Sequence, residues 1–194
     1  MSSAAKPSVS PEEYLALERA AETKSEYFRG EMFALAGAGR RHNLLVASLI
    51  ERLRPEARRR GCQVYPSDMR IGIRAIGKYT YPDLAITCGN EEFEDPVADT
   101  LLNPVVLVEV LSETTEKYDR GTKFEHYQKL PSLRLYVLVT QDRPRVEVFG
   151  REEGTFWRYE AFEGPQAVLA LDPPGVTIPL RELYEGILEQ PAEG

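Results

Sequence analysis

Apolar residues recur at helical spacing in two segments of the N-terminal half of the chain. The first helix is expected to run from Ser10, an N-cap serine followed by a proline and a capping-box glutamate, to about Ala21. The second is expected from His42 to about Arg60, because Gly61 is typical of the residue that follows a helix end. Its apolar stripe consists of Leu44, Leu45, Ala47, Leu49, Ile50 and Leu53.

Shorter apolar runs in the rest of the chain predict β-strands. Two runs on either side of Arg29-Gly30 predict a β-hairpin. Asp119 is expected to cap a later helix that Pro131 ends. The other predicted strands are residues 62–73, a run that begins at Pro82-Asp83, residues 105–111 after an acidic loop at about 89–103, and residues 133–140. The order that starts with the long helix is therefore αβββαβ.

This order predicts an α/β fold in which a mixed sheet is flanked by helices, with a helix and a hairpin before it. Three short runs after residue 145 predict an antiparallel extension, and a last helix is expected near residues 180–188. The runs cover residues 146–149, 156–162 and 167–171. A chain of 194 residues has the length of one domain. We therefore expect a single domain over residues 1–194, with its core at about 40–140 and flexible ends at 1–9 and 190–194.

Composition narrows the classes of function. A formal net charge of −7 is unfavourable for a broad phosphate-binding face, although arginines crowd the second helix and form either its solvated side or a local basic face. No apolar run approaches the ~18 residues of a membrane span. The first residues do not resemble a signal peptide, so we expect a cytoplasmic protein. Cys62 and Cys88 belong to no metal-binding motif and are expected to be thiols in a reducing compartment.

Glu109 has the clearest chemical consequence, because it interrupts the apolar run of residues 105–111. An ionised carboxylate inside a buried strand costs several kcal/mol unless it is paired, hydrogen-bonded or bound to a metal. Side chains alternate along a strand, so Glu109 is expected to share one face with the leucines two positions away. If the Asp83 strand lies beside it, the two carboxylates and the Val110 carbonyl can bind Mg²⁺ or Mn²⁺.

Lys123 is the candidate for the third member of this site. It lies one turn into the helix expected to begin at Asp119, and Tyr127, one turn further on, is expected to pack beneath it. An ammonium group there can stabilise negative charge that develops on a phosphoryl group or help to position the nucleophile. Two carboxylates and a lysine therefore indicate a metal-dependent hydrolase site.

Beyond single residues, the chain resembles the bacterial restriction endonuclease family of the PD-(D/E)XK nuclease superfamily over about residues 10–150. The motifs that carry the resemblance are His42, Tyr81-Pro82-Asp83, Val108-Glu109-Val110-Leu111-Ser112, Asp119 with Lys123 and Tyr127, and Leu135-Tyr136-Val137-Leu138-Val139. The resemblance implies a nuclease that acts on DNA, with Asp83 and Glu109 as metal ligands, and a homodimer, because related nucleases cut two strands with two subunits. The superfamily motif puts its lysine where this chain has Leu111, so Lys123 is expected to replace it.

Each assignment has an alternative. A structural ion pair with Lys123 or an arginine also accounts for Glu109. His42 fits a local hydrogen-bonding residue better than a metal ligand. Glu31 either joins the site or is an exposed carboxylate beside the hairpin turn. At the level of function, the alternative to a Mg²⁺- or Mn²⁺-dependent endonuclease is a non-catalytic interaction module that retains the nuclease fold, and metal affinity separates the two.

Overall fold

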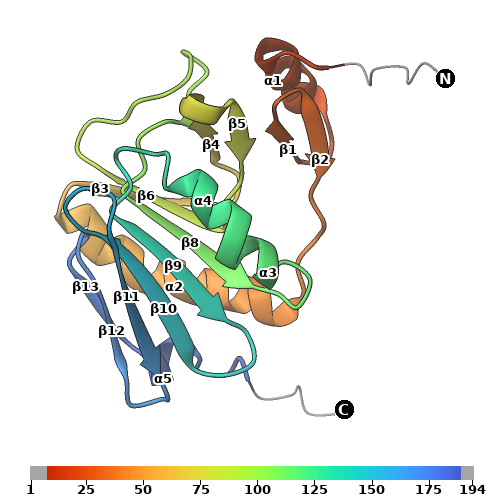
Figure 1. The fold of residues 1–194 in the computed structure, drawn as a ribbon. Helices are drawn as coiled ribbons and strands as arrows, with labels where there is room; N and C mark the ends of the chain where they lie inside the picture. The colour runs from red at the N-terminus through yellow and green to blue at the C-terminus, as the bar shows by residue number, and fades with distance from the viewer. Residues whose placement is uncertain (1–7, 189–194) are drawn as a thin grey trace, which may run out of the picture.

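A six-stranded mixed sheet forms the centre of the computed structural model, which describes residues 8–188. Figure 1 shows this sheet with the long helix on one side and a shorter helical segment on the other, as the predicted fold class requires. The sheet order is β11-β10-β9-β8-β6-β3. Strands β8 and β9 run parallel, and the other neighbouring pairs are antiparallel. The strands are β3 (Cys62–Pro66), β6 (Leu84–Cys88), β8 (Val106–Leu111), β9 (Leu135–Thr140), β10 (Arg145–Arg151) and β11 (Trp157–Glu163).

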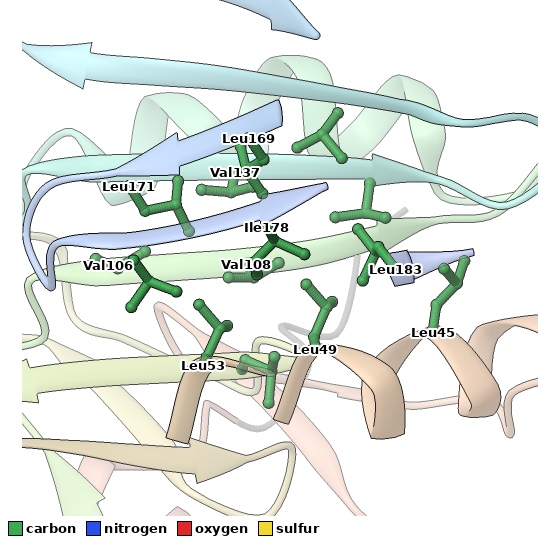
Figure 2. Packing of buried hydrophobic residues seen from close by; sticks show 14 of the residues in the cluster. Leu45, Leu49, Leu53, Val106, Val108, Val137, Leu169, Leu171, Ile178 and Leu183 are labelled. Atoms are coloured by element: carbon green, nitrogen blue, oxygen red, sulfur yellow. The ribbon is translucent and has the colours of Figure 1, made fainter. Parts of the chain in front are cut away.

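Helix α2 (Arg40–Arg59) covers one face of this sheet because its buried leucines repeat every four residues. Figure 2 shows Leu45, Leu49 and Leu53 directed toward the sheet residues Val106, Val108 and Val137. The hairpin β12 (Val168–Leu171) and β13 (Val176–Pro179) and the short helix α5 (Leu180–Leu183) complete this core. Shortening one of these leucines to alanine would cost about 2–5 kcal/mol of folding free energy.

The opposite face of the sheet carries a second apolar cluster. Leu107 and Leu111 of β8 lie in it with Tyr136 and Leu138 of β9, whereas Val106, Val108 and Val110 face α2. The expected alternation along residues 105–111 is therefore confirmed. The helical segment that covers this face consists of α3 (Glu116–Tyr118), one π-helical turn (Asp119–Lys123) and α4 (Phe124–Tyr127).

A smaller sheet, β2-β1-β5-β4-β7, stands beside the main one and includes the predicted hairpin. Helix α1 (Pro11–Ala20), which has the predicted capping box, packs on it through Tyr14 against Tyr27 and Tyr79. The strands are β1 (Ser25–Phe28), β2 (Glu31–Ala34), β4 (Arg70–Ile73), β5 (Lys78–Thr80) and β7 (Thr100–Leu101). A short 3₁₀ helix (Arg74–Ile76) joins β4 to β5.

Three local predictions were wrong. Residues 62–73 are not one strand, because a turn after Pro66 sends β3 into the main sheet and β4 into the smaller one. Asp119 does not cap a helix, because helical backbone already begins at Glu116 and Asp119 lies buried inside the segment. The last helix begins at Leu180 as expected but already ends at Leu183, where the chain goes into a turn in which Gly186 has the left-handed backbone conformation.

The two cysteines also differ from expectation. Cys62 and Cys88 are directly opposite each other in the β3–β6 pair, and their sulfur atoms are joined in a disulfide. Strand register places the two side chains together, which the separation of 26 residues does not reveal. Of the predicted flexible ends, only Ser8 and Val9 are described, and the Val9 N–H donates to the Gly30 carbonyl. No helix within residues 8–188 is long and apolar enough to cross a membrane.

Candidate functional site

A cleft of about 780 Å³ is lined by residues from the hairpin, the start of α2, the chain just before β6, the end of β8 and the helical segment after β8. Asp83, Glu109, Val110, His42 and Lys123 all line it. Chain segments distant in sequence thus bring five of the predicted site residues into one cavity. Among predicted residues outside the lining, Tyr127 is fully buried behind Glu109, whereas Glu31 is exposed on β2.

Asp83 occupies the position just before β6, where the pairing of β6 with β8 stops. The last paired residues are Leu84 and Val108, so the Val110 N–H lies beyond the ladder. Asp83 Oδ2 accepts a 2.7 Å hydrogen bond from that N–H group. In an extended strand the N–H and C=O groups of one residue point to the same side, so the Val110 carbonyl also faces the Asp83 side.

His42, at the start of α2, holds the same carboxylate oxygen. Its Nε2 atom lies 3.0 Å from Asp83 Oδ2, and its Nδ1 atom is buried with no hydrogen-bond partner in the described part of the chain. A neutral imidazole with its proton on Nε2 donates to Asp83 and leaves no N–H group unpaired at Nδ1, so we assign that tautomer. His42 therefore orients Asp83, as the sequence indicated.

Glu109 is buried on the face of β8 that it shares with the leucines, and it meets two donors. Lys123 Nζ and the Tyr127 hydroxyl each lie 2.8 Å from Glu109 Oε1. Burial raises the pKa of Glu109 to about 8; the Lys123 charge opposes this rise, and the Asp83 and Asp119 carboxylates add to it. A carboxyl group that repels its acidic neighbours in this way is suited to sharing a cation with them.

Lys123 is buried between two carboxylates. Its Nζ atom lies 3.5 Å from Asp119 Oδ1, in addition to the contact with Glu109. Burial by itself would lower the pKa of Lys123, but the charges of Glu109, Asp119 and Glu26 outweigh it and raise this pKa. Lys123 therefore stays protonated. Its Nζ lies 6.0 Å from the centre of the Tyr127 ring, which confirms that Tyr127 packs against it.

Glu26 and Lys78 are charged residues of the cleft that sequence reasoning missed. Both are buried, and Lys78 Nζ lies 2.9 Å from Glu26 Oε2. Thr80 Oγ1 donates to the other oxygen of Glu26, and Lys78 also donates to the Tyr118 hydroxyl at 3.0 Å. The signal in the sequence that could have identified Glu26 is its position directly before Tyr27-Phe28, in one strand of the predicted hairpin. Glu26, rather than Glu31, is thus the hairpin carboxylate that reaches the cleft.

The oxygen atoms of Asp83 and Glu109 fit a hard divalent cation. Each carboxylate uses one oxygen for its protein contacts. Within residues 8–188 the other oxygens, Asp83 Oδ1 and Glu109 Oε2, make no protein hydrogen bond, and both residues line the cleft. No cluster of three or more His, Cys, Asp or Glu side chains suited to a metal occurs among those residues. Mg²⁺ typically takes one or two carboxylates and completes its shell with water, which this pair can support.

Comparison with known proteins places the chain among relatives of similar length. It is 30% identical over 181 residues to the uncharacterised protein slr1290 of Synechocystis sp. (strain ATCC 27184 / PCC 6803 / Kazusa), covering 93% of this chain and 94% of the relative. It is 34% identical over 155 residues to sll1609 of the same organism, covering 80% and 88%.

A solved structure shares the fold. It is a crystal structure of a "putative nuclease belonging to DUF820" from Anabaena variabilis ATCC 29413, with a TM-score of 0.74 at 18% identity. The match covers 93% of this chain and 99% of that one. The Uma2 family model, described as "Putative restriction endonuclease", matches residues 11–181. The chain therefore belongs to the Uma2 family of restriction-endonuclease-like proteins.

Proposed function

We propose that this protein is a Mg²⁺- or Mn²⁺-dependent endonuclease that hydrolyses phosphodiester bonds in DNA. One observation carries the proposal: Asp83 and Glu109 converge in a cleft, and within residues 8–188 each keeps one oxygen that makes no protein hydrogen bond. Membership of the restriction-endonuclease-like family supports the choice of a phosphodiester as the substrate. Asp83, Glu109 and the Val110 carbonyl would hold the metal.

A divalent ion held there would polarise a phosphoryl oxygen and lower the pKa of bound water. The residues of the chain supply the rest of the mechanism. His42 and the Val110 N–H fix the orientation of Asp83, and Tyr127 fixes that of Glu109. Lys123 stays protonated, so its role is to stabilise the negative charge that develops on the phosphate as water attacks, and not to act as a general base.

The interaction module remains the alternative function. The contact of Lys123 with Glu109 favours it, because a buried ion pair accounts for both residues without a metal. The two functions differ in one respect that can be measured directly. An endonuclease needs Asp83 for chemistry, whereas an interaction module needs it only for local structure.

Cleavage of supercoiled and single-stranded DNA tests the proposal. The wild-type protein should cut with Mn²⁺ and stop when the metal is chelated, and Asp83→Asn, purified in parallel, should not cut. Asp172→Asn is the matched control, because Asp172 is exposed and lies outside the cleft lining. Equal cutting by wild type and Asp83→Asn would identify a contaminant. No cutting of either DNA by wild type would favour the interaction module.

A further inference from the structure

The rim of the cleft is aromatic and exposed, although its floor carries the carboxylates. Phe33 on β2 is 47% exposed, and Tyr118 in the helical segment is 37% exposed. Leu35, just after β2, is 38% exposed, and all three residues line the cleft. Leaving two aromatic rings in water at one opening forgoes the burial that rings of this size normally find. A ligand with a flat apolar surface would cover them.

The charges of the cleft are unsuited to a long stretch of phosphate backbone. Its three lysines each lie beside a carboxylate: Lys24 is 2.9 Å from Asp68, and Lys78 and Lys123 are paired with Glu26 and Glu109. Among residues 8–188 no arginine lines the cleft, and the whole chain has a formal net charge of −7. Binding of a DNA duplex draws most of its non-specific affinity from lysine and arginine contacts with many phosphates.

We infer that the substrate enters this cleft as a single strand, with unpaired bases stacked on Phe33 and Tyr118. The inference rests on the proposed nuclease function and specifies its substrate. Bases are available for stacking in a single strand, whereas in a duplex their faces are covered by neighbouring base pairs. Stacking on aromatic side chains tolerates any sequence, because every base presents a flat π-face. A volume of about 780 Å³ is in the range of pockets that enclose small ligands, so the cleft suits a short strand segment.

Fluorescence anisotropy measures this preference. The probes are a labelled short single-stranded oligonucleotide and a hairpin duplex of the same sequence, with Ca²⁺ as the oxygen-binding cation and gels to verify that the DNA stays intact. Wild type should bind the single strand more tightly than the duplex. Phe33→Ala should weaken single-strand binding about 5- to 100-fold, the usual loss for one stacking ring. Phe33→Trp, which keeps a flat ring, should bind as wild type does, and Phe33→Leu, which keeps only apolar volume, should resemble Phe33→Ala.

Phe156→Ala is the matched control, because Phe156 is 75% exposed and does not line the cleft. Its single-strand affinity should equal that of wild type. Thermal melts verify that each Phe33 variant is folded.

Tighter binding of the duplex than of the single strand, or unchanged single-strand affinity in folded Phe33→Ala, overturns the inference. If wild type cuts duplex DNA but neither binds nor cuts the single strand, the inference fails and the nuclease function stands. If it binds the single strand through Phe33 and cuts no DNA, the nuclease function fails and the strand preference stands.

Discussion

Lys123 Nζ and Glu109 Oε1 lie 2.8 Å apart in the interior, although the two residues come from a helix and a strand. In the superfamily motif the lysine follows two residues after the glutamate, and Leu111 holds that position here, buried among apolar side chains. The helical segment over this face of the sheet delivers a lysine to the same carboxylate. The contact serves either as a structural ion pair or as part of a catalytic site, and the predictions on Mn²⁺ binding, Lys123 and Glu109 distinguish these roles.

The first prediction concerns metal binding. Asp83→Asn should weaken Mn²⁺ binding by more than about tenfold, because loss of a ligand charge should cost at least as much as loss of an outer-shell partner. The asparagine keeps an acceptor for the Val110 N–H, so the local structure should persist. Isothermal titration calorimetry measures the affinity, with Asp172→Asn as the exposed control outside the cleft. Equal Mn²⁺ affinity in wild type and Asp83→Asn would contradict the proposed site.

The second prediction concerns Lys123. Lys123→Met should reduce metal-dependent cleavage about 10²- to 10³-fold while Mn²⁺ binding survives, because it removes a cation that acts on charge developed during the reaction. Cleavage rates at matched metal occupancy measure the effect. Lys129→Met, which changes an exposed lysine nearby, should cut at the wild-type rate. Undiminished cleavage by Lys123→Met would remove Lys123 from the mechanism.

The third prediction concerns the stability of the metal-free protein. Glu109→Gln should leave the unfolding free energy at pH 7 unchanged or raise it, because Asp83 and Asp119 already disfavour the Glu109 charge and Lys123 keeps Asp119 as a partner. Thermal melts in chelator measure this. A structural ion pair predicts the opposite, a loss of about 3–5 kcal/mol.

The same variant has a pH signature. Burial raises the pKa of Glu109 to about 8 in the folded protein, against its ordinary value of 4.5, so the folded state holds an extra proton between these pH values. The unfolding free energy of the metal-free protein should therefore fall as pH rises through that window, and Glu109→Gln should remove this contribution. If the unfolding free energies of wild type and Glu109→Gln change with pH in the same way, Glu109 does not titrate in this range.

The fourth prediction concerns Glu26. Burial would raise its pKa, but the charges of Lys123 and Lys78 and the hydrogen bonds from Thr80 and Lys78 lower it overall. Glu26 thus stabilises the fold above its unfolded pKa, near 4.5, and this contribution is lost as pH falls below that value.

The stability of Glu26→Gln, compared with that of a control variant, tests the role of Glu26. Glu26→Gln should destabilise the protein by about 3 kcal/mol at neutral pH, because it leaves the buried Lys78 without its opposite charge, and it should flatten the acid limb of the stability profile. Glu22→Gln is the matched control, since Glu22 is exposed in the loop just before the same hairpin. Urea unfolding at several pH values measures both. Equal stability of the two variants would show that the Glu26 pair is not a structural element of the cleft.

Local pattern in the sequence determined the elements and the face on which each side chain lies. The four-residue repeat of leucines in α2 and the alternation along β8 predicted both apolar clusters, and they placed Glu109 on one face of a buried strand. Asp83 was correctly expected beside it, because both carboxylates belong to strands that the αβββαβ order puts into one sheet. These features follow from backbone periodicity and chain order, which are readable without long-range contacts.

Tertiary structure alone decided which charges meet. Asp119 has the sequence signal of a helix cap, yet helical backbone starts before it and turns it toward Lys123. Glu26 and Glu31 are both acidic residues of one hairpin, and only the packing of that hairpin against the helical segment puts Glu26 in the cleft. Strand register likewise joined the two cysteines. Pairing of residues far apart in the chain depends on register and on the packing of whole elements, which local side-chain patterns do not encode.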